Sequence, residues 1–437
     1  MKKGTGQKLW EKAKMLIPGG NQLLSKRAEL FAPKQWPAYY SRAEGAYIWD
    51  MDGNKYLDML NMGIGSCTLG YADKDVNRAV IEAVNRGSMS TLNSPQEVEL
   101  AELLLKLHPW ADMVRYARTG GESMAIAARI ARASTGRDTI AFCGYHGWAD
   151  WYLATNLAKK DALADHLLKG LEPLGVPKGL AGTILPFHYN KIEELEAIVK
   201  KNPNIAAIIM EPMHGEYPRD GFLEKVREIA TRIGAVLVFD EITIGFRLTI
   251  GGAHLILNVE PDLAIFAKGM SNGFAMAAII GKREIMQAAQ DTFISSTYWT
   301  EAIGPAATIA SITKMQKVNL PAHLAKIGTA VKKIWLETGE KHGLNVTASE
   351  VLPILFFSFK DVDSAVMKTL LVQEMLKRGI LATTQFYASY AHTDEHVADY
   401  AKALGEVFAL IREAVTHGNA RDLLEGPVAH SGFERLN

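Results

Sequence analysis

Short apolar runs alternate with amphipathic helix patterns through the middle of the chain. The apolar runs are TIAFC, AAIIM, AVLVFD and LAIFAK, and one of the helix patterns is GFLEKVREIATRIG. In that pattern Phe222, Val226, Ile229 and Ile233 recur at helical spacing and predict one buried face. Alternation of this kind is typical of parallel strands joined by helical crossovers. We therefore expect an α/β fold built on a large, mostly parallel sheet.

The two ends of the chain have a different pattern. Residues 8–17 predict a helix that stops at a Pro-Gly-Gly sequence, and residues 45–60 predict a hairpin around an Asp-Gly turn. After about residue 310, helix patterns surround the strand-like VLPILFFSF at 351–359, and a last helix closes near residue 417. We expect an N-terminal segment (1–60) packed with a smaller α+β C-terminal domain (311–437), and a large α/β domain over 61–310.

Composition excludes several classes of protein. Lys+Arg and Asp+Glu are balanced at 48 each, so bulk charge indicates no nucleic-acid or membrane partner. The only two cysteines, Cys67 and Cys143, form no disulfide framework and fit a reducing compartment. No apolar run approaches the roughly 18 residues of a membrane span, and the N-terminus lacks an apolar signal core. We expect a cytoplasmic protein.

Two of the apolar runs end on residues with complementary chemistry. AVLVFD ends on Asp240, and PDLAIFAK ends on Lys268. Ligands of open α/β sheets bind beyond the carboxyl ends of such strands, so the carboxylate and the amine are expected to converge. A buried carboxylate can hold a proton on a pyridine nitrogen, and a partly desolvated lysine can bind an aldehyde and move a proton. The pair predicts pyridoxal 5′-phosphate (PLP) as cofactor. Alone, the lysine would be a solvated side chain and the aspartate a cap.

Three further segments offer groups for the same ligand. Residues 119–123 (TGGES) lie between a predicted strand and helix, where backbone N–H groups and the helix dipole favour a phosphate. The simpler alternative is a glycine turn with a threonine cap. Residues 144–147 (GYHG) follow another strand, and Tyr145 could stack on a flat ring or belong to the core. Ser296 and Thr297 add hydroxyls in a loop.

With these motifs the chain resembles the class III (fold type I) PLP aminotransferases, near glutamate-1-semialdehyde aminomutase and related sugar-pathway aminotransferases. The resemblance runs from IPGG at 17–20 to about residue 410. Its most specific part is FDEITIGFR followed by the lysine of AKG, with GGAH and PDLA between them. The resemblance implies an aminotransferase that moves an amino group from an amino donor to a carbonyl acceptor. It also implies a homodimer with shared active sites.

The resemblance assigns roles to individual residues. It implies Lys268 as the Schiff-base lysine and Asp240 as the partner of the ring nitrogen. Ile242 and Tyr145 would lie against the two faces of the ring. The phosphate would be held by Gly120 and Gly121, and by Thr297 of the neighbouring subunit. His146 and Glu211, which ends the run AAIIME, complete the predicted cofactor-binding residues.

Several positions depart from the family pattern. The family's serine-glycine-threonine phosphate turn is Thr119-Gly120-Gly121 here and loses one hydroxyl. Ile64 stands where the aminomutase has a pocket tryptophan, Tyr387 where it has a pocket glutamate, and Glu216 where an asparagine lies near the cofactor. We predict that these three residues contact substrate and that a keto sugar is the acceptor. The intramolecular aminomutase reaction is the alternative, and Glu216 could instead simply pair with Arg219.

Two other motifs indicate different enzymes. GMSNG (269–273) matches the nucleophile elbow of serine hydrolases, with His392 downstream. That motif needs a helix directly after Ser271, whereas FAMAAIIG predicts a strand. HTDEH (392–396) matches a zinc-peptidase pattern, but Thr393 followed by two acids is typical of a capped helix start. We expect neither a hydrolase nor a metal site.

Overall fold

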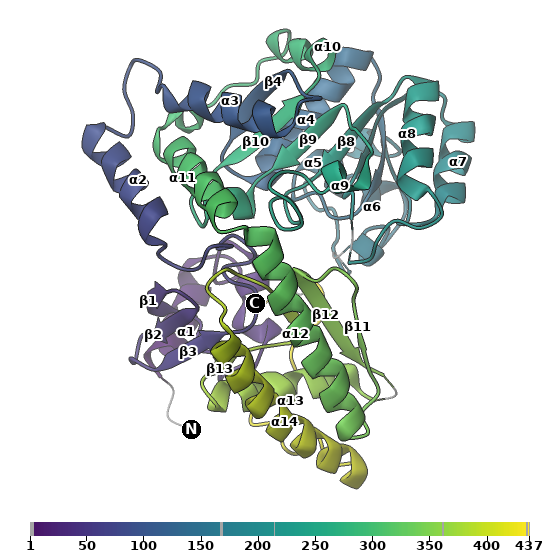
Figure 1. Cartoon of the computed structure of the whole chain (residues 1–437). Helices are drawn as coiled ribbons and strands as arrows, with labels where there is room; N and C mark the ends of the chain where they lie inside the picture. Colours follow the sequence, from purple (N-terminus) through teal and green to yellow (C-terminus); the bar gives the residue numbers. More distant parts are fainter. Residues whose placement is uncertain (1–3, 167–168, 214, 361, 434–435, 437) are drawn as a thin grey trace. The chain divides into compact units, whose positions relative to one another are not determined.

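The computed structural model describes residues 4–166, 169–213, 215–360, 362–433 and 436 (Figure 1). The chain divides into two compact units. One unit is continuous and comprises Lys74–Pro321, and the other combines Met1–Asp73 with Ala322–Asn437. The sequence predicts these two boundaries at 60/61 and 310/311.

The continuous unit is built on a seven-stranded sheet with the order β4-β10-β9-β8-β7-β5-β6. Strands β5 to β9 pair in parallel, and β10 runs antiparallel to both β9 and β4. The predicted α/β fold with a mostly parallel sheet is confirmed. The strands are β4 (Met113–Ala117), β5 (Thr139–Cys143), β6 (Ile184–Pro186), β7 (Ile205–Met210), β8 (Val236–Asp240), β9 (Leu263–Phe266) and β10 (Ala277–Gly281).

Helices cover both faces of this sheet (Figure 1). The α-helices are α2 (Lys74–Arg86), α3 (Gln96–Leu107), α4 (Gly120–Thr135), α5 (Asp150–Leu153), α6 (Thr155–Ala158), α7 (Ile192–Lys201), α8 (Phe222–Ile233), α9 (His254–Leu257), α10 (Arg283–Met286) and α11 (Ile303–Lys317). Short 3₁₀ helices are η3 (Ala164–His166), η4 (Lys178–Leu180), η5 (Lys268–Ser271), η6 (Gln287–Gln290) and η7 (Thr297–Thr300).

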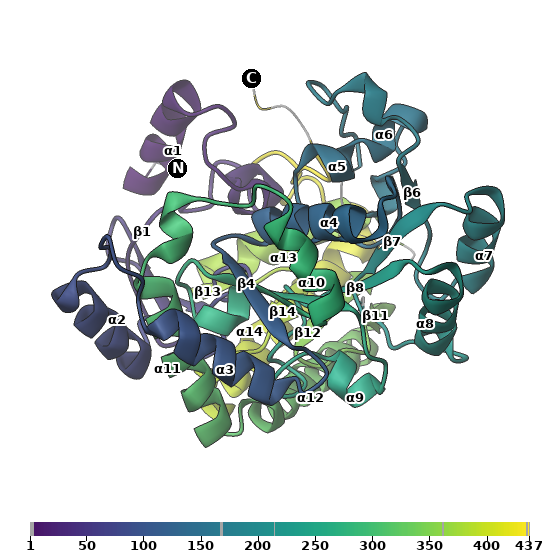
Figure 2. The same ribbon diagram turned by 90° about the horizontal axis from the view of Figure 1, so that it is seen from above.

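Alternate residues of the central strands face two separate cores. In β8, Val236 and Val238 pack in one core with residues of α4, whereas Leu237 and Phe239 pack in the other with α8. Figure 2 shows β7 and β8 between α4 and the pair α7 and α8. Because both faces are covered, a strand here must be apolar at every position. This burial explains the continuous apolar runs of the sequence.

The second unit holds two small sheets. Their orders are β1-β2-β3-β13 and β11-β12-β14, and β2 and β3 form the expected hairpin. Strand β3 pairs in parallel with β13, which joins the two segments of this unit. The strands are β1 (Tyr40–Glu44), β2 (Tyr47–Asp50), β3 (Lys55–Asp58), β11 (Val346–Ala348), β12 (Ile354–Phe359), β13 (Ile380–Leu381) and β14 (Gln385–Tyr387). The helices are α1 (Thr5–Leu16), η1 (Leu24–Lys26), η2 (Ala28–Leu30), α12 (Leu320–Lys341, which begins at the unit boundary), α13 (Ser364–Lys377) and α14 (Asp394–His417).

Within the described residues, no helix combines the length and the apolar character needed to cross a lipid bilayer.

Candidate active site

Asp240 and Lys268 lie at the same edge of the large sheet. Strands β8 and β9 are parallel neighbours, with Asp240 opposite Ile265, and Lys268 follows β9 as the first residue of η5. The two side chains are close enough that the carboxylate of Asp240 favours the charged form of the Lys268 amine. The predicted convergence of an acid and a lysine beyond neighbouring strands is therefore present in the fold.

Asp240 is an almost fully buried carboxylate, with 3% of its surface exposed. Its Oδ2 lies 2.8 Å from Nδ1 of His146, and its Oδ1 accepts a hydrogen bond of 3.0 Å from the backbone N–H of Ile242. Burial raises the pKa of Asp240, and the hydrogen bond with His146 opposes this rise. Desolvation disfavours the carboxylate, whereas donors aimed at it favour the charged form.

His146 fixes the position of one proton beside Asp240. Its Nε2 lies 3.0 Å from the carbonyl oxygen of Cys143, which can only accept, so Nε2 donates. The hydrogen bond between Nδ1 and the Asp240 carboxyl then needs one more proton on one of those two atoms. The buried pair consequently holds a proton between ring and carboxyl, and any positive group added on the other side of Asp240 favours the ionised carboxylate.

The amine of Lys268 lies beside a threonine and a buried arginine. Lys268 Nζ donates a hydrogen bond of 2.8 Å to Oγ1 of Thr243, and Arg247 Nε donates one of 2.7 Å to the carbonyl of the same threonine. Desolvation lowers the pKa of Lys268, and the charge of Arg247 adds to this effect. Lys268 also adopts a left-handed backbone conformation, with φ of 44°. Such strain in a non-glycine residue is typical of functional positions.

Thr243 and Arg247 were missed as site residues from the sequence. Both belong to FDEITIGFR, so their position after Asp240 was a signal. Arg247, with 1% of its surface exposed, is one of the largest fully buried side chains, which hydrophilicity alone would not suggest.

The N-terminus of α4 is capped, and the first two residues of the helix are glycines. Thr119 accepts from the N–H of Glu122, and the Glu122 carboxylate accepts from the N–H of Thr119, which forms a capping box. The helix starts with Gly120 and Gly121, whose amides have no partner within a helix. A Cβ on Gly120 would lie 2.9 Å from Cδ1 of Ile242, so this glycine lets the turn approach the residue predicted to contact the ring. The threonine-cap alternative and an anion-binding helix start are thus both compatible with the structure.

The loops after β5 and β7 place the other predicted cofactor residues at the same edge. Tyr145 and His146 follow β5, and Glu211 follows β7. A Cβ on Gly144 would lie 2.5 Å from Oε2 of Glu211, so the two loops touch. The charge of Glu211 acts on both Asp240 and Lys268. The continuous unit therefore brings Tyr145, His146, Glu211, Asp240, Ile242 and Lys268 together.

Thr297 begins η7 and is exposed. Its predicted contact is with the phosphate of a neighbouring subunit, so this role stays a prediction.

The three predicted substrate residues fall in both units. Ile64 and Tyr387 belong to the unit formed by the two ends of the chain, where the N–H of Tyr387 donates to the carbonyl of Leu60 at 2.9 Å. Ile64 has φ of 58°, which is strained for a β-branched residue. Glu216, in the loop after β7, pairs with Arg219 at 3.3 Å, and both side chains are exposed. The alternative pairing of Glu216 is thus the arrangement in this structure.

The two competing motifs have structural explanations. Ser271 is buried at the end of η5 and is followed by β10, so the serine is not followed by the helix that a nucleophile elbow requires. His392 lies in the other unit, where its Nδ1 faces the N–H of Ser389 and its Nε2 faces the carbonyl of Asp58. Thr393 caps α14 and accepts from the N–H of His396, as expected for a helix start.

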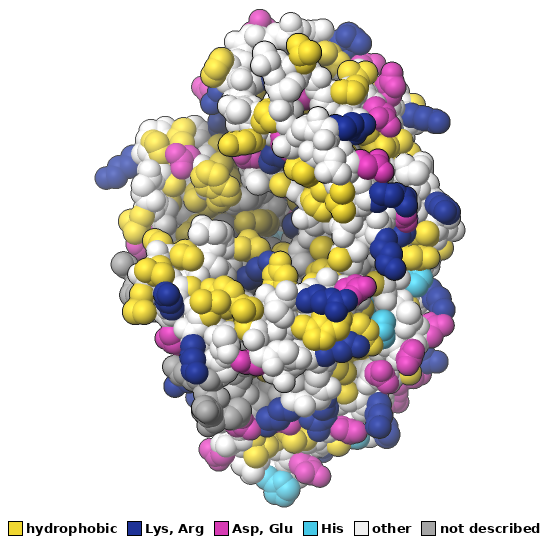
Figure 3. Space-filling model, turned by 90° about the vertical axis from the view of Figure 1, so that its left-hand side faces the viewer, with side chains coloured by type: hydrophobic (Ala, Val, Ile, Leu, Met, Phe, Trp, Pro, Cys, Tyr) yellow, Lys and Arg dark blue, Asp and Glu magenta, His cyan; other side chains and the backbone are white. Residues whose placement is uncertain are grey.

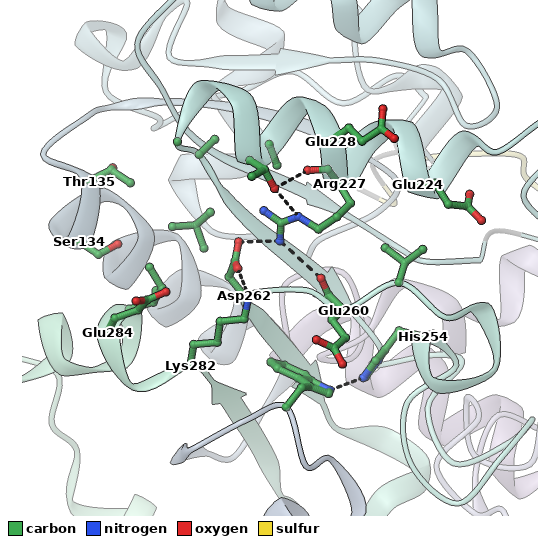
Figure 4. Close-up of a pocket in the computed structure, with 18 of the residues that line it drawn as sticks. Ser134, Thr135, Glu224, Arg227, Glu228, His254, Glu260, Asp262, Lys282 and Glu284 are labelled. Atoms are coloured by element: carbon green, nitrogen blue, oxygen red, sulfur yellow. Dashed lines mark hydrogen bonds and ion pairs between the residues drawn. The ribbon is translucent and has the colours of Figure 1, made fainter.

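A large pocket of about 1230 Å³ lies at the opposite edge of the sheet (Figure 4). It is lined by the first residue of β8, by residues flanking β9 and β10, by the end of α4 and by residues along α8. At its centre Asp262 pairs with Arg227 and with Lys282, each at 2.9 Å. Since these charges satisfy one another and none of the predicted site residues lines the pocket, we place the chemistry at the carboxyl edge.

Comparison with known proteins identifies the family of the chain. Residues 31–408 match the model of the class-III aminotransferases, and the chain belongs to this family. It is 32% identical to a 3-aminobutyryl-CoA aminotransferase of Cloacimonas acidaminovorans, over 94% of this chain and 99% of the relative. It is 30% identical to a 2′-deamino-2′-hydroxyneamine transaminase of Streptomyces kanamyceticus, over 85% of this chain and 92% of the relative.

Solved structures show the same fold. The PLP-bearing FumI protein of Sphingopyxis sp. MTA144 superposes with a TM-score of 0.85 at 26% identity, over 94% of this chain and 98% of that one. The protein is a PLP-dependent aminotransferase of class III. The buried carboxyl of Asp240, the desolvated amine of Lys268 and the Gly120-Gly121 start of α4 all fit this cofactor.

Proposed function

We propose that Lys268 binds the cofactor aldehyde and that Asp240 partners the ring nitrogen. The observation that carries this assignment is their placement at the carboxyl ends of the parallel neighbours β8 and β9. PLP supplies a reactive aldehyde and a ring that withdraws electrons from the bond being broken. The lowered pKa of Lys268 increases the fraction of free amine at Nζ, which can attack a carbonyl and later take up a proton. Asp240, oriented by His146, holds a proton on the ring nitrogen.

Reduction with borohydride tests the lysine assignment. After reduction of the holoenzyme, peptide mass spectrometry should find the pyridoxyl group on Lys268. A label on any other lysine would contradict the assignment while leaving the family unchanged.

We further propose that the acceptor is a polyhydroxylated carbonyl compound, such as a keto sugar, with an amino acid as donor. The Streptomyces kanamyceticus relative is named as a transaminase of 2′-deamino-2′-hydroxyneamine, which supports a substrate of this class. Ile64 replaces the pocket tryptophan of the aminomutase, and Tyr387 replaces its pocket glutamate. These replacements support a substrate pocket that differs from that of the aminomutase in shape and in charge.

A 3-ketoacyl thioester is the second candidate acceptor. The relative from Cloacimonas acidaminovorans is named for a 3-amino acyl-CoA, and this chain covers 99% of it. The pair between Glu216 and Arg219 also offsets the charge of the Glu216 carboxylate, which removes a reason to exclude negatively charged substrates.

A comparison of acceptors decides between these reactions. The enzyme would be incubated with glutamate or alanine and with a keto sugar, a 3-ketoacyl-CoA or glutamate 1-semialdehyde, and products would be identified by mass spectrometry. We expect amination of the keto sugar. Amination of the thioester alone would favour the second candidate, and isomerisation of the semialdehyde without a donor would restore the aminomutase.

We propose a cytoplasmic homodimer. Both cysteines are buried and neither forms a disulfide, which suits a reducing compartment. Hydrophobic side chains are exposed on the side of the molecule where α2 and α3 lie (Figure 3). On these helices and the loop between them, Ile81, Val84, Leu92 and Val98 are each more than half exposed. Several such residues on one side favour contact with a second subunit.

A further inference from the structure

Trp148 directly follows the GYHG loop and lies against the start of α4. A Cβ built on Gly121 would lie 2.7 Å from Nε1 and 2.8 Å from Cδ1 of Trp148. The loop and the helix are close in their backbones as well, since a Cβ on Gly147 would lie 3.0 Å from Cα of Gly121. The indole edge that carries the N–H therefore occupies the space that a side chain at position 121 would fill.

The N–H of this indole is available to a ligand. The Trp148 side chain is 68% exposed, and its Nε1 makes no hydrogen bond with any residue that the structure describes. An indole nitrogen can only donate. A donor beside the first amides of α4 adds to their positive potential, so it suits the anionic group expected at this helix start.

Position 121 is also where this chain lacks the hydroxyl of the serine-glycine-threonine turn that the family uses for the phosphate. The turn Thr119-Gly120-Gly121 has a glycine in place of a residue that could donate from its side chain, and the Thr119 hydroxyl is occupied as the helix cap. Gly121 has a helical backbone without a positive φ, so its backbone does not explain the glycine. The indole does explain it, because a Cβ at position 121 would displace the indole from the position it occupies.

We propose that Trp148 is a cofactor-binding residue whose Nε1–H donates to the phosphate of PLP and replaces the missing hydroxyl of position 121. Gly121 and Trp148 then act as one unit, in which the glycine makes room for the indole. This inference rests on the proposed placement of the phosphate at Gly120 and Gly121.

Binding of cofactor to the apoenzyme tests the proposal without any measurement of activity. Trp148→Phe keeps a flat aromatic ring and loses the N–H. The dissociation constants of PLP and of pyridoxal, which lacks the phosphate, would be measured by absorbance on full-length wild type and variant. Loss of one hydrogen bond to a charged group should weaken PLP binding by about tenfold or more and leave pyridoxal binding unchanged. Equal losses for both ligands, or no loss for either, would overturn the proposal.

Exchange of the donor provides the second arm. Gly121→Ser in the wild-type background should weaken PLP binding, because its Cβ meets the indole. In the Trp148→Ala background, the same substitution should strengthen PLP binding relative to Trp148→Ala alone, because the serine hydroxyl then enters the space that the indole has left. An effect of the same sign in both backgrounds would contradict the proposed unit. Wild-type protein that bound PLP at a lysine other than Lys268 would instead refute the proposed function, so the two failures are distinguishable.

Discussion

At the scale of single residues, the site depends on two buried groups whose ionisation burial opposes. Asp240 and Lys268 are shifted toward their neutral forms by desolvation, and each is held by a specific partner, His146 and Thr243 respectively. These partners offset part of the cost of burying the two groups, and a bound cofactor would offset more of it. In the proposed arrangement, a cofactor that carries a ring proton and an aldehyde would satisfy both residues at once.

The first prediction concerns the charge of Asp240. Asp240→Asn keeps the size of the side chain but cannot hold a proton on the ring nitrogen, so kcat should fall by at least about a hundredfold. The phosphate contacts remain, and PLP binding should change far less than turnover. Steady-state rates and cofactor titration would be measured on the same preparation. A variant that binds PLP and retains a near-normal rate would show that Asp240 is not the ring partner.

The second prediction concerns the pH dependence of apoenzyme stability. The pKa of Lys268 is lowered in the folded state, so between that pKa and 10.5 the unfolded chain binds a proton that the folded chain lacks. Stability from this residue therefore rises with pH through that window. Lys268→Met removes the effect and should raise the free energy of unfolding most below the window, with the gain shrinking toward pH 10.5. Urea unfolding across pH would measure it.

Lys282→Met is the matched control for that experiment. Its amine pairs with Asp262 at the opposite edge of the sheet, so the substitution should bring no gain in stability. If Lys268→Met left the dependence of stability on pH unchanged, the desolvation of Lys268 would be refuted.

At the scale of elements, the start of α4 combines a structural cap with the proposed phosphate site. Glu122 accepts hydrogen bonds from the N–H groups of Arg118 and Thr119, at 3.1 and 2.9 Å. These bonds fix the turn that leads into the first amides of α4. The same residues thus stabilise the helix and orient its donors.

The third prediction tests this cap. Glu122→Ala should lower the free energy of unfolding by about 1 kcal/mol, because two backbone donors lose their acceptor. Glu122→Gln retains an acceptor and should cost much less. Urea unfolding of the three apoenzymes would measure the difference. Equal losses for Ala and Gln would mean that charge, not the capping hydrogen bond, stabilises this turn.

The elements that the sequence predicts well are those whose signal is local. The runs that end on Asp240 and Lys268 are strands because both faces are buried, and the helical spacing of α8 follows from its contact with one core. The direction of β10 has no such signal, since the apolar pattern of AAIIG is equally suited to a parallel and to an antiparallel strand. The contact of Trp148 with Gly121 and the pairing of Glu216 with Arg219 depend on how loops approach in space, which spacing along the chain does not determine.

At the scale of the whole molecule, hydrophobic residues on α2, α3 and the loop between them support association of two chains. The fourth prediction is that wild-type protein is a dimer by light scattering and that Leu92→Glu with Val98→Glu dissociates it. These substitutions place charges where apolar surface would be buried. Ile256→Glu on α9, also exposed, is the control and should leave the mass unchanged. A monomeric wild type would contradict the proposed homodimer.

The discontinuous unit has a consequence for how the chain is made. Strand β3 pairs with β13, so the first 73 residues cannot complete their own sheet until the last part of the chain has been synthesised. The continuous unit, residues 74–321, has all its strands available earlier and can fold on the ribosome first. At roughly 5–20 residues per second, the N-terminal segment then waits on the order of tens of seconds for its partner. During translation, a chaperone that binds exposed apolar surface would therefore act on this N-terminal segment rather than on the large sheet.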